Sequence, residues 1–398
     1  MLVGIVGKPN CGKSTFFKAL TLADVEIANY PFATIKPNHG IGFVRVECAD
    51  KDFKVQCNPR EGFCIDNTRF VPIDIIDVAG LVPGAHEGKG MGNQFLSDLN
   101  QADALIHVID CSGGTNEKGE PIDIGGYNPA NDIKFLEEEL DHWYLEILKK
   151  GWEKFARKIQ QEHRDVAKAI AKQMSGVGVD EDMTKEILRT QNLDAENPSI
   201  WDKEQLMNLA KSFRKKTKPI VIAANKIDVK GAIENFENLK KEFPDELIIA
   251  CSAESELALK EAAKHKLIDY TPGSKEFIMN NKSNLSDTQK KALDFIRQLL
   301  ENNKSTGVQD ILEKAVFGLL KRIAVFPGGI SKLEDQYGNI LPDCFLLPPN
   351  SKALDFAYHI HTDLGDKFIK AIDVKNKRTV GKNHELKHRD VIEVITRK

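Results

Sequence analysis

Short, almost wholly apolar runs alternate with amphipathic stretches through much of the chain, and this alternation predicts an α/β fold. The run at residues 2–6 (LVGIV) and the run at residues 104–110 (ALIHVID) are typical of strands buried on both faces of a parallel sheet. The amphipathic segment at residues 15–20 reads as the first helix. The runs predicted as strands of this sheet are residues 2–6, 42–46, 70–77, 104–110, 219–224 and 246–250.

A stripe with helical spacing interrupts this alternation between residues 128 and 215. Apolar residues recur there at steps of three and four, beginning with Ile133, Leu136 and Leu140, and the flanking positions are dense in Glu, Lys and Arg. The stripe ends at residues 175–178 (SGVG), where two glycines break it. We therefore predict an inserted, coiled-coil-like α-helical hairpin, whose Met and aromatic residues serve the core first and a partner surface second.

The last part of the chain changes character twice. Residues 276–321 show helical patterns that include a capping-box signal, Ser286 with Gln289. Residues 322–398 carry short strands around one helix, which predicts a small α+β domain with basic turns at residues 375–378 and 387–389. The predicted boundaries are 1–127 and 216–275 for the two parts of the α/β domain, 128–215 for the helical insertion, 276–321 for a helical connector and 322–398 for the C-terminal domain.

The composition is that of a globular protein with more than one core. The 398 residues are 41% hydrophobic and 29% charged, and a chain of this length is expected to form two or three domains. No stretch approaches the ~18 consecutive apolar residues of a membrane span. Because the first strand begins at Leu2, we expect no signal or transit peptide, a cytoplasmic location and no membrane partner. The net charge of −3 leaves any contact with nucleic acid to local patches.

Residues 7–14 (GKPNCGKS) lie between an apolar strand and an amphipathic helix, which is the context of a phosphate loop. The glycines let successive backbone N–H groups and the helix N-terminus face an anion. Lys13 is expected to reach the β- and γ-phosphates of a nucleotide, and the Ser14 hydroxyl to ligate Mg²⁺. The residues of this stretch predicted to bind nucleotide are Gly7, Pro9, Asn10, Cys11, Gly12, Lys13, Ser14 and Thr15.

Two further residues are predicted metal ligands of the same site. Asp77 ends an apolar strand and is followed by Gly80, the Walker-B arrangement, in which the carboxylate holds Mg²⁺ through water and the glycine N–H faces the γ-phosphate. Thr34 lies in an irregular, proline-containing segment. It reads either as a Mg²⁺ ligand that senses the γ-phosphate or as an exposed loop hydroxyl, and the local sequence leaves both open. The predicted metal ligands are Ser14, Thr34 and Asp77.

The tetrapeptide at residues 225–228 (NKID) follows a buried strand and predicts the purine that binds. The Asp228 carboxylate can accept parallel hydrogen bonds from guanine N1–H and the exocyclic amine, whereas adenine would leave it partly unpaired. Asn225 is expected to tie this turn to the phosphate loop, and the Lys226 stem to cover the base. After the last strand, a backbone N–H of the Ser252–Ala253 turn is expected to meet guanine O6. The base-binding residues are therefore Asn225, Lys226, Asp228, Ser252, Ala253 and Glu254.

The seven cysteines, in a chain without a signal-peptide pattern, read as reduced thiols. Cys48, Cys57 and Cys64 fall close together between two predicted strands. A zinc site would need a fourth ligand and a closer Cys-x-x-Cys pair, and the sequence makes neither visible. Ordinary thiols in a hairpin excursion are therefore favoured over zinc.

Several stretches carry a family resemblance in addition to these motifs. Residues 29–32 (NYPF), 77–84 (DVAGLVPG) and 88–93 (GKGMGN) resemble the Obg superfamily of translation-factor-type GTPases, and the insertion and layout resemble its YchF branch in an archaeal form. The tail, at residues 355–364 and 380–381, resembles a TGS domain, a ubiquitin-like β-grasp module. The resemblance implies a Ras-like P-loop GTPase domain with the inserted helical hairpin and a C-terminal TGS domain.

The same resemblance implies a function. It is a slow, Mg²⁺-dependent GTPase switch that binds GTP and GDP and acts on the ribosome or RNA, through the TGS and helical domains, in translation or ribosome biogenesis. We expect a monomer. Two alternatives stay open: an ATP-preferring hydrolase of the YchF kind, and an RNA- or protein-binding module that uses nucleotide as a structural ligand.

Two positions refine this reading. YchF proteins carry a degenerate base-reading motif and prefer ATP, so the complete motif at residues 225–228 predicts GTP here. Leu81 stands where many GTPases have a water-orienting glutamine, a substitution that the family shares. Some relatives with it recruit K⁺ through an asparagine of the phosphate loop, and Asn10 lies at the matching position. The predicted catalytic residues are Lys13, Thr34, Gly80 and Asn10.

Overall fold

The chain folds as two compact units, each assembled from two segments. The computed structural model describes residues 1–21, 38–78, 98–162, 164–280 and 285–397. The first unit comprises Met1–Phe17 and Ile76–Glu254, and the second comprises Lys18–Ile75 and Ser255–Lys398. Thr34, Gly80 and Leu81 lie outside the described residues. None of the helices in the described part of the chain is long and apolar enough to cross a membrane.

Parallel strands form the centre of the first unit. They pair in the order β1-β5-β6-β7, with Val6 opposite His107 and His107 opposite Ile222. All seven residues of β5 are buried, as are all six of β6, which explains their largely apolar sequences. Because the strands are parallel, their carboxyl ends share one edge of the sheet. The strands are β1 (Leu2–Val6), β5 (Ala104–Asp110), β6 (Ile220–Asn225) and β7 (Leu247–Ala250).

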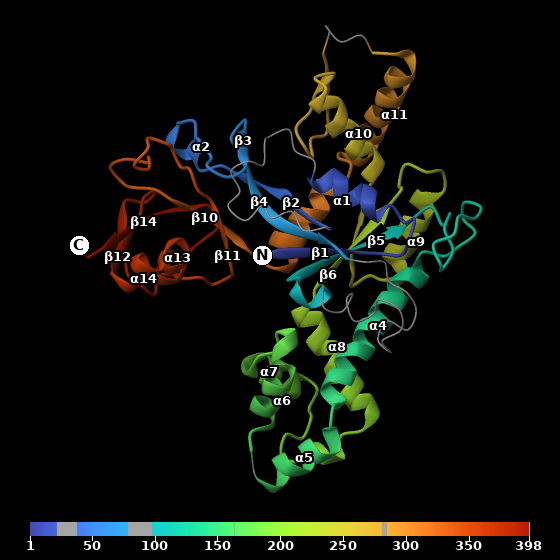
Figure 1. The fold of residues 1–398 in the computed structure, drawn as a ribbon, viewed down its shortest axis with the longest axis vertical. Helices are drawn as coiled ribbons and strands as arrows, with labels where there is room; N and C mark the ends of the chain where they lie inside the picture. The colour runs from blue at the N-terminus through green and yellow to red at the C-terminus, as the bar shows by residue number, and fades with distance from the viewer. Residues whose placement is uncertain (22–37, 79–97, 163, 281–284, 398) are drawn as a thin grey trace. The chain divides into compact units, whose positions relative to one another are not determined.

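In the described residues of the helical insertion, the predicted hairpin is divided into five α-helices. The long helices α4 and α8 pack together, and the three shorter helices lie between them in sequence (Figure 1). Their shared core is apolar and aromatic, with the rings of Trp152 and Trp201 stacked at 5.5 Å. The helices are α4 (Ala130–Lys149), α5 (Trp152–Gln161), α6 (Val166–Met174), α7 (Glu181–Thr190) and α8 (Lys203–Thr217).

Capping residues explain the breaks that the apolar stripe alone does not reveal. Gly151 adopts a left-handed conformation, with φ of 71°, at the start of α5. The side chain of Asp165 accepts hydrogen bonds from the first turn of α6, and Asp180 does the same for α7. Asp202 and Gln205 form a capping box at α8. The stripe persists through these breaks because all five helices turn their apolar faces to one core.

A β-hairpin begins the second unit. β3 (Phe63–Ile65) pairs antiparallel with β4 (Thr68–Asp77), and the two linking residues, Asp66 and Asn67, both have positive φ. This is the geometry of a tight hairpin turn, and Asp and Asn tolerate it better than most residues do. β4 also neighbours β2 (His39–Glu47), and the one-turn helix α2 (Asp50–Phe53) follows β2. The last two residues of β4 belong to the first unit.

The connector has its own small core. Leu293, Ile296 and Leu300 of α11 pack with Leu259 and Phe277. Ser286 and Gln289 form the predicted capping box, with the Gln289 N–H 3.2 Å from Ser286 Oγ. The elements are α10 (Ala253–Lys264), β8 (Ile268–Asp269), β9 (Ile278–Met279), α11 (Asp287–Asn303), α12 (Val308–Glu313) and a π-helix (Lys314–Leu319).

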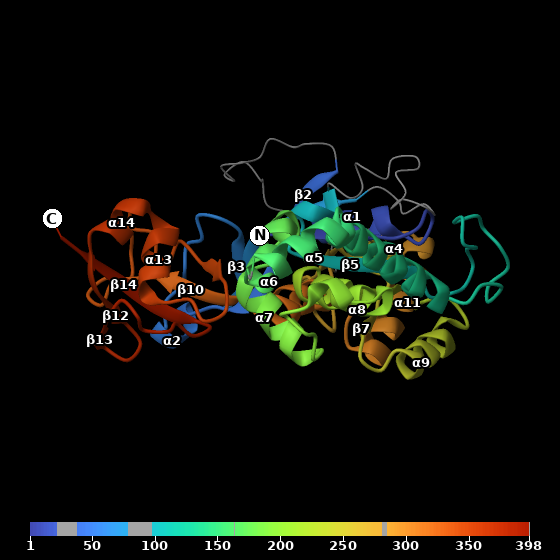
Figure 2. The ribbon, with the colours of Figure 1, turned by 90° about the horizontal axis from the view of Figure 1, so that it is seen from below.

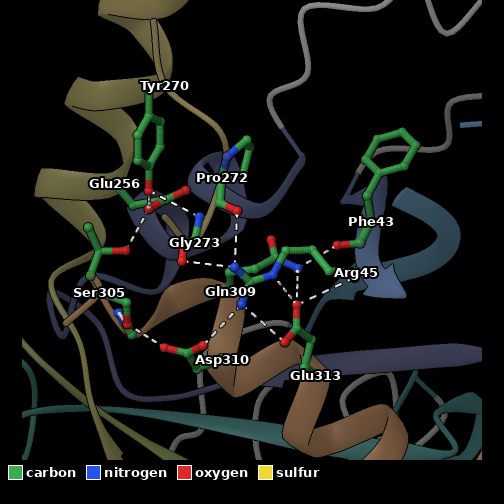
Figure 3. Close-up of polar contacts among 12 residues, drawn as sticks. Phe43, Arg45, Glu256, Tyr270, Pro272, Gly273, Ser305, Gln309, Asp310 and Glu313 are labelled. Atoms are coloured by element: carbon green, nitrogen blue, oxygen red, sulfur yellow. Dashed lines mark hydrogen bonds and ion pairs between the residues drawn. The ribbon is translucent and has the colours of Figure 1, made fainter. Parts of the chain in front are cut away.

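Arg45 joins β2 to this connector (Figure 3). Its guanidinium bonds Glu313 Oε1 at 2.5 Å and Asp310 Oδ1 at 3.2 Å, and it donates to the Gly273 carbonyl at 2.8 Å. Nearby, the Tyr270 hydroxyl donates to Glu256 Oε2 at 2.7 Å. The Arg45 guanidinium therefore bonds two carboxylates and one carbonyl, and these bonds fix the position of α12 beside β2.

The C-terminal part of the second unit is a β-grasp domain. Its strands pair in the order β11-β10-β14-β12-β13, and only the pair β10–β14 is parallel. Helices α13 and α14 cover one face of the sheet (Figure 2), where Phe356 packs with Val325 and Ile392. The elements are β10 (Ile323–Pro327), β11 (Phe345–Leu347), α13 (Ala353–Ile360), α14 (Thr362–Asp366), β12 (Phe368–Asp373), β13 (Arg378–Val380) and β14 (Asp390–Thr396).

Candidate nucleotide-binding site

The loop at residues 7–14 connects β1 to α1 (Lys13–Thr21) at the carboxyl edge of the parallel sheet. Its two glycines occupy places where a side chain does not fit. A Cβ at Gly7 would lie 2.4 Å from the Val108 carbonyl oxygen, and a Cβ at Gly12 would lie 2.2 Å from Asn225 Nδ2. Gly12 also has a φ of 93°. These positions have room for backbone alone. The glycines therefore let the loop curl closely and present its N–H groups to an anion.

Lys13 and Asp77 form an ion pair within the first unit. Their side chains are 14% and 15% exposed. The Val78 N–H donates to the Ile5 carbonyl at 3.0 Å, and this bond holds the end of β4 beside β1 and so positions Asp77. Ser14, in the first turn of α1, is exposed, and its hydroxyl is open to a ligand. These groups suit a phosphate and a metal ion chemically, because they offer an ammonium, a hydroxyl and a carboxylate.

The turn at residues 225–228 is fastened to the phosphate loop by two side chains. Asn225 Nδ2 donates to the Cys11 carbonyl at 3.0 Å, and Asn225 Oδ1 accepts the Ala253 N–H at 3.0 Å. Lys226 Nζ donates to the Asn10 carbonyl at 2.9 Å. Asn225 thus ties this turn to the phosphate loop, as expected from the sequence, and it also contacts the loop that follows β7.

Asp228 has an acceptor atom that the described residues do not use. Its Oδ1 is buried, and within the described residues no hydrogen-bond donor contacts it. A buried acceptor without a donor costs free energy, about 1–3 kcal/mol. Two backbone bonds support the turn beside it: Ile227 N–H to the Cys251 carbonyl at 3.1 Å, and Cys251 N–H to the Ala224 carbonyl at 2.9 Å. Asp228 therefore offers a fixed, unsatisfied acceptor to a ligand that carries donors.

The residues after β7 differ from one another in exposure. Ser252 and Ala253 are buried, and Glu254 is exposed at the start of α10. The Ala253 N–H is used by Asn225, so this amide supports the site from within. Pro9 and Thr15 lie within the phosphate loop and the first turn of α1. The Pro9 carbonyl would lie 2.5 Å from a Cβ at Gly119, which shows how closely residues 113–125 pack against this loop.

Asp110, at the end of β5, is a part of the site that sequence reasoning missed. Its Oδ2 accepts from Lys226 Nζ at 2.8 Å and from Thr115 Oγ1 at 3.0 Å, and its Oδ1 accepts from Ser112 Oγ at 2.5 Å. Burial raises the pKa of Asp110, but the bonds from Lys226 and Ser112 outweigh it and hold the pKa below its usual value. The available signal was its position, an aspartate that ends an apolar strand as Asp77 does.

Lys8 is a second residue that sequence reasoning missed. It is buried, pairs with Asp132 Oδ2 at 2.9 Å, donates to the Thr115 carbonyl at 3.0 Å and lies 3.8 Å from the centre of the Tyr127 ring. Burial raises the pKa of Asp132 even beside this ammonium. Lys8 therefore fastens the phosphate loop to α4, while Lys13 is the lysine that meets Asp77.

Comparison with known proteins agrees with this geometry. Three family models match, described as a 50S ribosome-binding GTPase at residues 2–150, an Obg-like GTPase YGR210-like, G4 motif-containing domain at residues 223–328 and a TGS domain at residues 337–396. A GTP-binding protein of uncharacterised function from Methanocaldococcus jannaschii is 49% identical over 396 residues, 99% of each chain. The chain belongs to the Obg-like GTPases. Within them it is YchF-like and carries a TGS domain.

Other relatives of this Obg-like GTPase extend over most of its length. A GTP-binding protein from Schizosaccharomyces pombe is 39% identical, covering 89% of this chain and 88% of its own. The crystal structure of a GTP-binding protein from Pyrococcus horikoshii has a TM-score of 0.78 at 36% identity, with both chains covered in full. The Schizosaccharomyces pombe YchF GTPase shares the fold, with a TM-score of 0.60 at 21% identity over 99% of this chain and 97% of its own.

Proposed function

We propose that this Obg-like protein is a guanine-nucleotide switch that binds Mg²⁺–GTP and hydrolyses it slowly. The unsatisfied acceptor on Asp228 is the observation that carries the proposal. Guanine presents N1–H and an exocyclic amine to such a carboxylate, and adenine lacks both donors at the matching positions. The bonds of Asn225 and Lys226 to the phosphate loop support the same reading, because they join the base-reading turn to the phosphate-binding backbone.

Lys13, Ser14 and Asp77 are the described residues that would hold the phosphates and Mg²⁺. The metal, when bound, would neutralise charge on the phosphate oxygens. Lys13 would exchange its contact with Asp77 for the phosphates, which frees the carboxylate for the metal or a water bound to it. The Ser14 hydroxyl would take a further ligand position. Thr34 and Gly80 stay proposals from the sequence.

An ATP preference is the main rival. The ribosome-binding ATPase YchF of Escherichia coli O157:H7 is 35% identical over 171 residues, 42% of this chain and 44% of its own. Displacement of a fluorescent guanine nucleotide by GTP and by ATP, at equal Mg²⁺, separates the two readings. We expect GTP to compete at least about tenfold better, because the mismatch leaves a buried acceptor unpaired. Better competition by ATP would defeat the proposal.

We also propose that K⁺ assists hydrolysis through Asn10. The Asn10 amide nitrogen donates to the Gly119 carbonyl at 2.9 Å, and this bond orients the side chain. Its amide oxygen is then the group that a cation beside the phosphates would take. A bound K⁺ would supply positive charge where other GTPases use an arginine.

We propose the ribosome, or RNA within it, as the partner. The names of the YchF relatives and the description of the family model for residues 2–150 support this choice. In the β-grasp domain, Lys377, Arg378 and Lys387 are exposed. Two other basic residues of the same turns have acidic partners: Lys375 pairs with Asp52, and Arg389 pairs with Glu47 and Asp52. An electrostatic contact with phosphates would therefore fall to the exposed residues.

Steady-state GTP turnover with and without ribosomes tests the switch. We expect slow turnover that ribosomes raise, together with cosedimentation that differs between GDP and a non-hydrolysable GTP analogue. Glutamine at positions 377, 378 and 387 should weaken cosedimentation and its salt dependence while leaving nucleotide affinity unchanged. A turnover equal to that of buffer, even with ribosomes, would instead favour a binding module that uses nucleotide as a structural ligand.

A further inference from the structure

Three cysteines and one aspartate meet in the second unit, in the excursion at residues 48–67 between β2 and β4. Cys48 follows β2, Asp50 begins α2, Cys57 lies in the loop and Cys64 lies in β3. Three sulfur atoms and one carboxylate oxygen all lie within 4.8 Å of one another. The Cys48 and Cys57 sulfurs are 3.6 Å apart, and the Cys64 sulfur is 3.8 Å from Asp50 Oδ2.

The distances of 3.6 and 3.8 Å match those between ligands around one tetrahedral ion, and all four atoms lie within 4.8 Å of one another. A zinc ion bound to sulfur at about 2.3 Å and to oxygen at about 2.1 Å holds its tetrahedral ligand atoms about 3.6–3.8 Å apart. A disulfide would require the two sulfurs to approach to about 2.05 Å. The four groups therefore gather closely enough to be ligands of one metal ion.

Asp50 supplies a second, independent observation. The residue is completely buried, with 0% exposure, and its Oδ1 has no hydrogen-bond partner within the described part of the chain. Its Oδ2 accepts one N–H, from Cys57 at 3.3 Å. A buried carboxylate with so little compensation is unfavourable unless a cation neutralises it. Cys48 is also 0% exposed and Cys57 is 3% exposed, while Cys64 is partly buried, so protein would surround most of the cation.

Arg69 adjusts the charge of this cluster. It is 1% exposed and stands opposite Cys64 in the pairing of β3 with β4. Its terminal nitrogens donate to the carbonyls of Leu341 at 3.1 Å and Pro342 at 2.6 Å. Three thiolates and a carboxylate carry four negative charges, which a divalent ion and this guanidinium together reduce to one.

We propose that Cys48, Asp50, Cys57 and Cys64 bind one Zn²⁺ ion in a closed, structural site. Thiolates select zinc over Mg²⁺ or Ca²⁺, which prefer ligand sets made of oxygen alone. Four protein ligands leave no position for substrate, which is the mark of a structural zinc site. Asp50 is the fourth ligand that the sequence did not reveal, because it is a carboxylate only two positions from Cys48 rather than a Cys or His in a separate pair.

The ion would stabilise a segment that has little regular structure of its own. Within residues 48–67, α2 has four residues and β3 has three. The same excursion supports the start of the β-grasp domain: the Asn58 N–H donates to the Ile340 carbonyl at 2.8 Å, and the Arg60 N–H donates to the Pro342 carbonyl at 2.9 Å. Loss of the ion should therefore loosen the excursion and its contacts with residues 340–342 together.

The metal content of the full-length protein tests the site directly. The protein is purified under reducing conditions without chelator, and zinc, iron, nickel and cobalt are measured by mass spectrometry. We expect about one zinc per chain, and we expect Cys57→Ser and Asp50→Asn to lose it. Cys344→Ser is the matched control, because Cys344 is a partly buried free thiol of the same unit outside the ligand set. The control should keep its zinc.

A second measurement needs no variant. Wild-type protein stripped with chelator is titrated with Co²⁺, and thiolate-to-cobalt charge transfer with the strong visible bands of tetrahedral cobalt should appear and saturate at one equivalent. Zinc should abolish these bands. The proposal is overturned by an absence of both zinc and cobalt bands, by iron in place of zinc, by unchanged zinc in the two ligand variants, or by a Cys48–Cys57 disulfide in the reduced preparation.

Discussion

Asn225 Nδ2 lies 3.0 Å from the carbonyl oxygen of Cys11, so one amide joins the turn that reads the base to the loop that receives the phosphates. The same side chain accepts the Ala253 N–H through its oxygen. Because all three segments follow parallel strands, their loops meet at one edge of the sheet. The bond explains how a motif more than two hundred residues from the phosphate loop can shape it.

Asn225→Ala should weaken nucleotide binding more than it weakens the fold. The side-chain bonds with Cys11 and Ala253, and the weaker one from the Cys251 thiol, are lost at a cost of about 1–3 kcal/mol. The dissociation constant for GDP should rise roughly tenfold to a hundredfold. Titration with a fluorescent nucleotide measures this change, and thermal melting without nucleotide reports the fold. Asn238→Ala, on the exposed face of α9 (Ala232–Glu242), is the control and should bind as the wild type does. Equal affinity in both variants would contradict the bridging role.

Asp228→Asn should change the preferred nucleotide from GTP to XTP. A carboxamide can donate to the carbonyl that xanthine carries where guanine has its amine, while it repels the guanine donors. Affinity for GTP should fall at least about tenfold, and affinity for XTP should rise by a similar factor. Competition against a fluorescent nucleotide measures both constants. Asp245→Asn, an exposed aspartate of the same unit, should change neither. If GTP and XTP bind the Asp228 variant as they bind the wild type, Asp228 does not read the base.

His107 should make the first unit sensitive to acid. It is 4% exposed in β5, and burial, followed by the nearby Lys8 charge, lowers its pKa from 6.5 to about 3. The unfolded chain takes up this proton below pH 6.5 and the folded chain does not, so stability is full above that pH and is lost as the pH falls toward 3. Between pH 5.5 and 4, the free energy of unfolding of the wild type should fall more steeply than that of His107→Gln, by about 1.4 kcal/mol per pH unit.

Chemical unfolding at several pH values gives these slopes. His265→Gln, an exposed histidine, is the control, and its slope should match that of the wild type. Because carboxylates whose pKa is lowered in the folded protein, such as Asp110, also reduce stability in acid, only the difference between wild type and His107→Gln reports His107. Identical slopes for wild type and His107→Gln would show that the buried imidazole takes up its proton in the folded state.

The parts of the site that could be predicted are those whose functional residues come directly after a buried strand in the sequence. The phosphate loop, Asp77 and residues 225–228 each stand directly after an apolar run, and parallel strands bring such positions to one edge. Lys8 with Asp132 and Lys226 with Asp110 could not be paired, because those contacts depend on how loops fold back over long sequence separations.

The same limit applies to the helical insertion and to the cysteine cluster. The apolar stripe predicted helices, but not their ends, because Asp165 and Asp180 cap helices whose apolar faces continue one core. Asp50 could not be recognised as a ligand because the chain folds back between it and Cys64, which lies 14 residues further on. Spacing along the chain does not encode that return.

Asn10→Ala should abolish the difference between the rates of GTP turnover in K⁺ and in Na⁺. If Asn10 holds a K⁺ ion beside the phosphates, wild-type GTP turnover should be faster in K⁺ than in Na⁺ at equal ionic strength, since the larger ion alone fits a site of carbonyl and amide oxygens. The variant should turn over equally slowly in both salts while keeping its GDP affinity within about threefold, because the phosphate-loop backbone stays in place. Phosphate release measures turnover. Equal wild-type rates in the two salts would exclude K⁺ at Asn10.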